Sequence, residues 1–194
     1  DDVFGDADGA IAYLERALVA SPAHPGAFER LERVLIARAD GAKLCDLYAR
    51  AAALRPSRDE QLRLLLRAAE LSDVYEGDPT RVVPIYEQLV KLAPDDLPAR
   101  RALSGCYLRA GKHVELAKLL EQALSRGLGE DDARGLRAEL MQLYAGPLRQ
   151  PERALPHVEL LLRETPGDAG ARAIANALFA NKTVSARAAE LLEA

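Results

Sequence analysis

The chain contains an internal repeat, and this repeat limits the possible folds more than any other feature of the sequence. Glu15, Glu87 and Glu159 stand at equivalent places in three successive copies. Residues 77–96 and 149–168 are identical at seven of twenty positions without a gap. A 72-residue period of this kind is typical of arrays of small structural units, each of which packs against its neighbours along the chain.

Each copy divides into smaller blocks that have the length of a helix. Gly77 and Gly111 stand at the two ends of one pair of blocks, and Gly and Pro recur in the gaps between blocks. Ala, Leu, Arg and Glu supply 36, 33, 21 and 16 of the 194 residues, whereas Val, Ile and Thr together supply 17. This composition favours helices and contains too few β-branched residues to form a sheet, so all-β and α/β folds are excluded. The repeating unit is therefore predicted to be a helical hairpin.

Apolar residues recur at helical spacing within the blocks, and Asp and Ser precede several of them as candidate N-caps. Because a lone hairpin cannot bury both of its faces, neighbouring hairpins must stack. We expect one continuous array over residues 1–194, and its start at Asp1 suggests a piece of a longer protein. The predicted helices cover residues 7–20, 25–38, 42–54, 59–75, 79–92, 97–110, 113–126, 131–145, 151–164, 169–181 and 184–193.

The 34-residue unit resembles the tetratricopeptide repeat. With Leu97 as the first position, the bulky, small, aromatic and glycine sites of that repeat correspond to Leu103, Ser104, Tyr107, Gly111, Leu120 and Ala123. The preceding unit supplies Gly77, Val82, Tyr86, Leu89 and the closing Pro94. The resemblance implies an all-α, right-handed α-α superhelix of about eleven helices.

Two departures from that repeat leave other helical-hairpin families open. Arg100 and Arg172 stand where a bulky apolar residue is usual, and two linkers are three or four residues long, so that successive units alternate in length. These departures leave open a half-a-tetratricopeptide repeat or another helical-hairpin relative. The pentatricopeptide family has a similar period and reads RNA, but the basic surface typical of that family is absent here.

The sequence contains no arrangement of residues typical of an enzyme. His24, His113 and His157 are isolated, with the first two in turns at helix starts where a cap or an exposed ring is expected. Cys45 and Cys106 lie in separate hairpins and are expected to be buried apolar residues. HExxH, GxSxG and GxxxxGK[ST] are all absent. We therefore predict no catalytic residue, no metal site and no cofactor.

The charge and hydropathy of the chain argue against two classes of partner, nucleic acids and membranes. The formal net charge is −4, which argues against nucleic acid as a partner. The longest apolar stretches are shorter than the ~20 residues that a bilayer requires, so membrane insertion is not expected. With two separated cysteines, a cytoplasmic location is the default expectation, and we expect a monomer that could associate end to end.

The resemblance implies that the first helix of each hairpin lines a concave groove for a peptide or a partner helix. The sequence thus predicts a protein–protein interaction scaffold, with arginines that could pair with an acidic partner. An architectural spacer or oligomerisation arm of a larger protein is the alternative. The predicted partner-binding residues on these first helices are Glu29, Arg33, Ile36, Arg101, Leu108 and Arg109.

Overall fold

A computed structural model describes most of the chain, and its described part consists of helices joined by turns, without a β-strand. Pro22, Gly77 and half of the predicted helix 184–193 lie outside the described residues. The described residues are 7–21, 24–74, 79–127, 129–179, 184–186 and 188–189.

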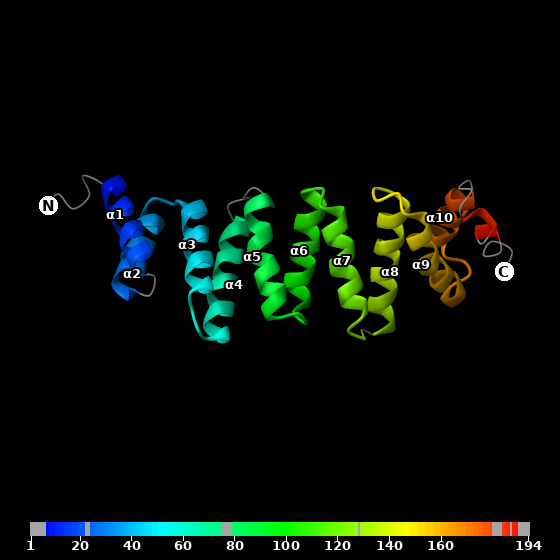
Figure 1. The fold of residues 1–194 in the computed structure, drawn as a ribbon, viewed down its shortest axis with the longest axis horizontal. Helices are drawn as coiled ribbons and strands as arrows, with labels where there is room; N and C mark the ends of the chain where they lie inside the picture. The colour runs from blue at the N-terminus through cyan, green and yellow to red at the C-terminus, as the bar shows by residue number, and fades with distance from the viewer. Residues whose placement is uncertain are drawn as a thin grey trace. The chain divides into compact units, whose positions relative to one another are not determined.

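Ten helices have defined bounds in the described part of the chain, residues 185–186 and 188–189 are helical as well, and the predicted all-α class is confirmed (Figure 1). Their ends differ from the predicted ends by two residues or fewer. The helices are α1 (Ala7–Ala20), α2 (Pro25–Ala37), α3 (Gly41–Ala53), α4 (Arg58–Val74), α5 (Pro79–Leu92), α6 (Leu97–Arg109), α7 (His113–Leu124), α8 (Glu130–Ala145), α9 (Pro151–Glu164) and α10 (Ala169–Phe179).

The period of the sequence is also the period of the structure. Helices α1, α5 and α9 begin at residues 7, 79 and 151 and end at residues 20, 92 and 164, so that each bound recurs after one period of the repeat. Helices α2, α6 and α10 likewise begin at residues 25, 97 and 169. Equivalent sequence positions therefore occupy equivalent structural positions, and residues one period apart can be compared directly.

Local side-chain signals explain where the helices begin and end. Asp96 accepts a hydrogen bond from Ala99 N at 3.0 Å, and Asp168, one period later, accepts one from Ala171 N at 2.8 Å. Each carboxylate satisfies an N–H group that has no partner within its helix. At the other end of α6, Gly111 turns the chain with a φ of 66°. Its equivalent after α2 is Ala39, which adopts a φ of 52° although it carries a side chain.

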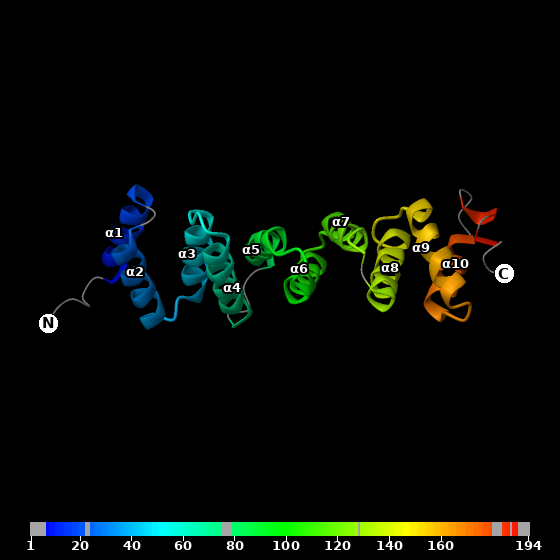
Figure 2. The ribbon, with the colours of Figure 1, turned by 90° about the horizontal axis from the view of Figure 1, so that it is seen from below.

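The chain forms two compact units, Asp1–Ala110 and Gly111–Ala194. In the first unit, each helix from α1 to α6 packs against the next one, and α3 and α4 run side by side in both views (Figures 1 and 2). The core of this unit contains the fully buried leucines Leu31, Leu35, Leu65, Leu89 and Leu103. A single continuous array over both units stays a prediction.

In the second unit, α7, α8 and α9 follow one another in contact, and α10 packs against both α8 and α9. Tyr144, Leu140 and Met141 of α8 are almost completely buried, together with Val158 and Leu161 of α9. The buried stripe of each helix therefore faces its neighbours, as expected for stacked helical hairpins.

Two polar side chains are more buried than their sequence context suggests. Arg100, at the position where Phe28 stands one period earlier, is 7% exposed and is thus a buried charged residue. His113 is the first residue of α7, is half-buried and makes no cap, since the N-cap is Lys112 without a side-chain hydrogen bond. The prediction of a capping or exposed ring is therefore correct for His24, whose Nδ1 accepts from Ala27 N at 3.2 Å, and wrong for His113.

Candidate functional site

The predicted partner-binding residues all lie on exposed positions of two helices in the first unit. Glu29, Arg33 and Ile36 share the solvent-facing stripe of α2, at spacings of four and three residues that place them on one side of a helix. Ile36 is 56% exposed, which is unusual for a large aliphatic side chain.

The second set of predicted residues lies on α6. Arg101, Leu108 and Arg109 are exposed, and Leu108, at 58% exposure, is equivalent to Ile36 one period earlier. Nη2 of Arg109 donates to Sγ of the buried Cys106 at 3.3 Å, so this guanidinium lies back along its own helix. The two sets belong to different hairpins, and the structure places them as two separate stripes.

Sequence reasoning missed a third stripe, on α4 between the other two. Asp59, Arg63 and Leu66 repeat the spacing of Glu29, Arg33 and Ile36, and all three are exposed. Leu66 is 44% exposed. Helices α2 and α4 share a pattern of an acidic residue, an arginine four positions later and an aliphatic residue three positions after the arginine. On α4 this pattern is hard to recognise, because leucines occupy residues 62 and 64 to 66.

A pocket of about 320 Å³ lies between α1, α2 and α3 of the first unit. Leu18 and Val19 form one wall, Leu47 and Leu54 form another, and Phe28 contributes from α2. Glu15 and Arg50 are the charged residues that line it. The pocket is apolar, without the converging polar groups that a catalytic site needs.

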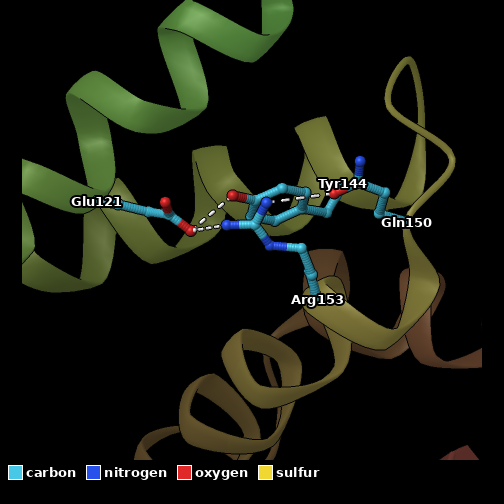
Figure 3. Close-up of polar contacts among 4 residues, drawn as sticks. All are labelled: Glu121, Tyr144, Gln150 and Arg153. Atoms are coloured by element: carbon cyan, nitrogen blue, oxygen red, sulfur yellow. Dashed lines mark hydrogen bonds and ion pairs between the residues drawn. The ribbon is translucent and has the colours of Figure 1, made fainter.

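A polar cluster in the second unit joins three helices at one carboxylate (Figure 3). Oε1 of Glu121 on α7 accepts from the hydroxyl of Tyr144 on α8 and from Nη2 of Arg153 on α9, both at 2.6 Å. The Arg153 guanidinium lies 4.4 Å from the centre of the Tyr144 ring, and it also donates to Oε1 of Gln150 at 3.3 Å. We call Glu121, Tyr144 and Arg153 the three-helix clasp.

Burial and hydrogen bonding perturb the groups of this cluster. Burial, reinforced by the Glu121 carboxylate, raises the pKa of Tyr144 to about 12. The ring of His157 stacks on that of Tyr144, with centroids 6.1 Å apart and planes at 9°. Burial lowers the pKa of His157, and the charges of Arg137 and Arg153 add to that effect while Glu121 opposes it.

The first unit contains two similar Glu–Tyr hydrogen bonds, each of which joins two helices rather than three. The hydroxyl of Tyr107 on α6 donates to Oε1 of Glu87 on α5 at 2.7 Å. Tyr48 on α3 is hydrogen-bonded to Glu32 on α2, and burial followed by this acceptor raises the pKa of Tyr48. The rings of Tyr48 and Tyr107 are therefore buried, and their hydroxyls connect neighbouring helices.

The cysteines behave as expected, because Cys45 and Cys106 are both buried thiols. Sγ of Cys45 donates to the carbonyl of Ala68 at 3.3 Å. Among the described residues, no group of three His, Cys, Asp or Glu side chains is arranged to hold a metal ion. In the same part of the chain, no helix is long and apolar enough to cross a membrane.

Stacked helices with a 72-residue structural period define a helical-hairpin repeat protein. Residues 74–140, about a third of the chain, match the sequence model of the tetratricopeptide repeat. This part of the chain, which covers α5, α6, α7 and most of α8, is therefore similar to the tetratricopeptide repeat.

Several solved structures are similar to this chain. YrrB, described as a TPR protein with an unusual peptide-binding site, is 17% identical over 86% of this chain and 82% of its own, with a TM-score of 0.43. A tetratricopeptide repeat protein from Parabacteroides merdae is 18% identical, over 97% of this chain and 72% of its own, with a TM-score of 0.41. A thermophilic TPR protein from Thermus thermophilus is 21% identical, over 90% and 92%, with a TM-score of 0.40. No curated protein sequence matches the chain.

Proposed function

We propose that this protein is an interaction scaffold whose helices α2, α4 and α6 bind an acidic helix or peptide of a partner protein. The observation that supports this most directly is the exposure of large aliphatic residues on all three helices, namely Ile36 on α2, Leu66 on α4 and Leu108 on α6, where Leu97 is exposed as well. A solvated spacer has no need of such residues, whereas a docking surface uses them to bury apolar area.

The charges around these residues indicate the chemistry of the partner. At the exposed positions described on α2, α4 and α6, seven arginines accompany three carboxylates, although the whole chain has a net charge of −4. Helix α8 of the second unit shows the reverse, with four exposed carboxylates and one exposed arginine. A partner segment with carboxylates beside an apolar stripe would complement the first three helices. The arginines are Arg30, Arg33, Arg58, Arg63, Arg67, Arg101 and Arg109.

In a tetratricopeptide-like array, the first helices of successive hairpins line one concave side, so that the three stripes would form a single groove. We accordingly propose one continuous array that is monomeric in dilute solution. The role is binding rather than catalysis, and the groove residues named from the sequence belong to it together with Arg63 and Leu66.

The test is affinity capture from a lysate of the source organism, read by mass spectrometry, with the wild-type chain and two variants. Replacing Ile36, Leu66 and Leu108 by Ser should remove the captured partner, because the aliphatic contacts are lost while the core is untouched. Val114→Ser on α7 is the matched control, since Val114 is 50% exposed and lies outside the proposed groove. Equal capture by the wild type and the triple variant would favour the spacer role.

A further inference from the structure

His157 occupies a position of the repeat that does not require an imidazole. The equivalent residue one period earlier is Ile85, which is 3% exposed in the core of the first unit, and the first copy has the exposed Tyr13 there. In the third copy, the ring of His157 meets Tyr144 of α8. The fold therefore tolerates an apolar residue at this place, and the third copy has a group that can take up a proton.

Charges of both signs act on the imidazole, whereas burial of the ring opposes its protonation. Arg137 of α8 and Arg153 of α9 are the cations that act on it, and Glu121 of α7 is the carboxylate. One oxygen of Glu121 already accepts from both Arg153 and Tyr144. Helix α10, which packs on α8 and α9, carries Arg172 as its single charged residue, and that side chain donates to the carbonyl of Pro166.

Two of the three acids on α9 are already paired with arginines. Glu159 pairs with Arg163 at 3.1 Å, and Glu164 pairs with Arg137 at 3.5 Å. The third acid, Glu152, is exposed in the first turn of the helix.

A proton on the half-buried His157 would therefore add a third cation beside Arg137 and Arg153, whose carboxylate partners are already engaged. Desolvation also disfavours the charged ring. His157 consequently binds a proton less readily in the folded state than in the unfolded chain. This difference in proton affinity makes the free energy of unfolding depend on pH.

We propose that His157 is an acid-sensitive latch between α9 and α8. A protonated ring beside Arg153 would repel the guanidinium from the Tyr144 ring and weaken the three-helix clasp, so that α9 separates from α7 and α8 more often. Stability of the second unit is then retained above the ordinary histidine pKa and lost as the pH falls below it. The histidine of the first unit, His24, is an exposed cap of α2, so helices α3 to α6 should lack this response.

The experiment is amide hydrogen exchange of the whole chain at neutral pH and at about pH 5, corrected for intrinsic exchange. In the wild type, acidification should accelerate exchange in α8 and α9 several-fold more than in α3 and α4. His157→Ile, which restores the residue of the earlier copy, should remove this difference. Equal acid sensitivity in the wild type and His157→Ile would overturn the proposal.

Two control variants separate His157 from the other histidines. His113→Asn changes the half-buried histidine of α7, and His24→Asn keeps a good N-cap on α2. Both should leave the acid-induced difference in place. Loss of that difference in His113→Asn would assign the acid response to α7 and overturn the proposal.

A second measurement tests the latch without any change at His157. Titration of the His157 ring by NMR should show a pKa below the ordinary histidine value, and Arg153→Gln should move that pKa upward because a neighbouring cation is removed. A ring that titrates at the ordinary value, or that ignores Arg153→Gln, would overturn the proposal even if His157→Ile failed to fold.

Discussion

Tyr144 and Glu121 join α8 to α7 through a hydrogen bond of 2.6 Å, and the same carboxylate oxygen accepts from Arg153 of α9. A Glu–Tyr pair between consecutive helices recurs at Glu87 and Tyr107, and Glu121 follows Glu87 by the length of one hairpin unit. A tyrosine in this position contributes its ring to the core and its hydroxyl to the neighbouring helix. The contact between the two helices thus combines apolar burial of the ring with a directional hydrogen bond from the hydroxyl.

Tyr144→Phe should lower the free energy of unfolding by about 1.5 kcal/mol at neutral pH, because a charged acceptor loses one donor while Arg153 remains. The raised pKa of Tyr144 adds a pH dependence. Because the pKa of Tyr144 is higher in the folded state than in the unfolded state, the neutral hydroxyl stabilises the folded protein at pH values below the ordinary tyrosine pKa of 10. This stabilisation is lost as the pH rises towards about 12. Urea unfolding across this range should therefore show a steeper alkaline loss in the wild type than in Tyr144→Phe. Tyr13→Phe, at an exposed tyrosine, is the control, and an equal loss in all three proteins would contradict the prediction.

Ala39→Gly should stabilise the first unit by about 1 kcal/mol, because Ala39 has a left-handed backbone that costs an L-residue ~1–2 kcal/mol. The reverse change at the equivalent position, Gly111→Ala, should destabilise by a similar amount. A Cβ at Gly111 would meet no atom within 4 Å, so that its cost would come from the backbone alone. Thermal unfolding of both variants measures the two effects, and shifts of the same sign would refute this explanation.

Gly135→Ala should raise the free energy of unfolding by ~0.5–1 kcal/mol, since Gly135 lies within α8 and a Cβ there would meet open space. Gly146, just after α8, provides the contrast. A Cβ at that position would lie 2.9 Å from the carbonyl oxygen of Gln142, so Gly146→Ala should destabilise. The two alanine variants should therefore move the urea midpoint in opposite directions.

Reversing Arg101 and Arg109 to Glu should weaken partner binding without unfolding the chain. Both side chains are exposed, so each contact should be salt-sensitive and contribute ~0.2–1 kcal/mol, or more if the partner desolvates it. Leu103→Ala is the opposite case, because Leu103 is buried in the core and its truncation should cost ~2–5 kcal/mol of stability. Circular dichroism and a binding assay on both proteins separate the two effects. Normal binding by the folded double reversal would place the partner elsewhere.

Chelator and reductant should leave the melting temperature unchanged. Cys45 and Cys106 are both buried thiols, and among the described residues no cluster of metal-binding side chains occurs. Differential scanning calorimetry with and without each reagent gives the measurement. A drop of several degrees with either reagent would reveal a metal or thiol contribution that the described residues do not suggest.

The helices could be predicted from the sequence because their signals are local. Asp96 and Asp168 cap the N–H groups of residues three positions further on, and Gly111 supplies the left-handed turn after its own helix. The 72-residue period is recognisable in the sequence alone, since equivalent residues repeat at equal separations along the chain. The order and bounds of the helices followed from these two kinds of information.

The exposed stripes of α2 and α6 could also be predicted, because a regular spacing of buried leucines determines the opposite face of a helix. On α4, leucines occupy residues 62 and 64 to 66, so the sequence does not show which of them faces solvent. Packing against α3 and α5 rotates the helix so that Leu65 is buried and Leu66 is exposed. The burial of Arg100 and His113 could not be predicted for the same reason, since it depends on neighbouring helices.

Local patterns along the chain were thus sufficient to establish an all-helical repeat, the bounds of its helices and the exposed stripes of α2 and α6. They could not show that Glu121, Tyr144 and Arg153 meet, or that His157 stacks on Tyr144, because these contacts exist only once the helices have packed. The residues come from three helices that are separated by turns. Helical periodicity constrains which side of its own helix a residue occupies, but the rotation and separation of two packed helices depend on all the side chains between them.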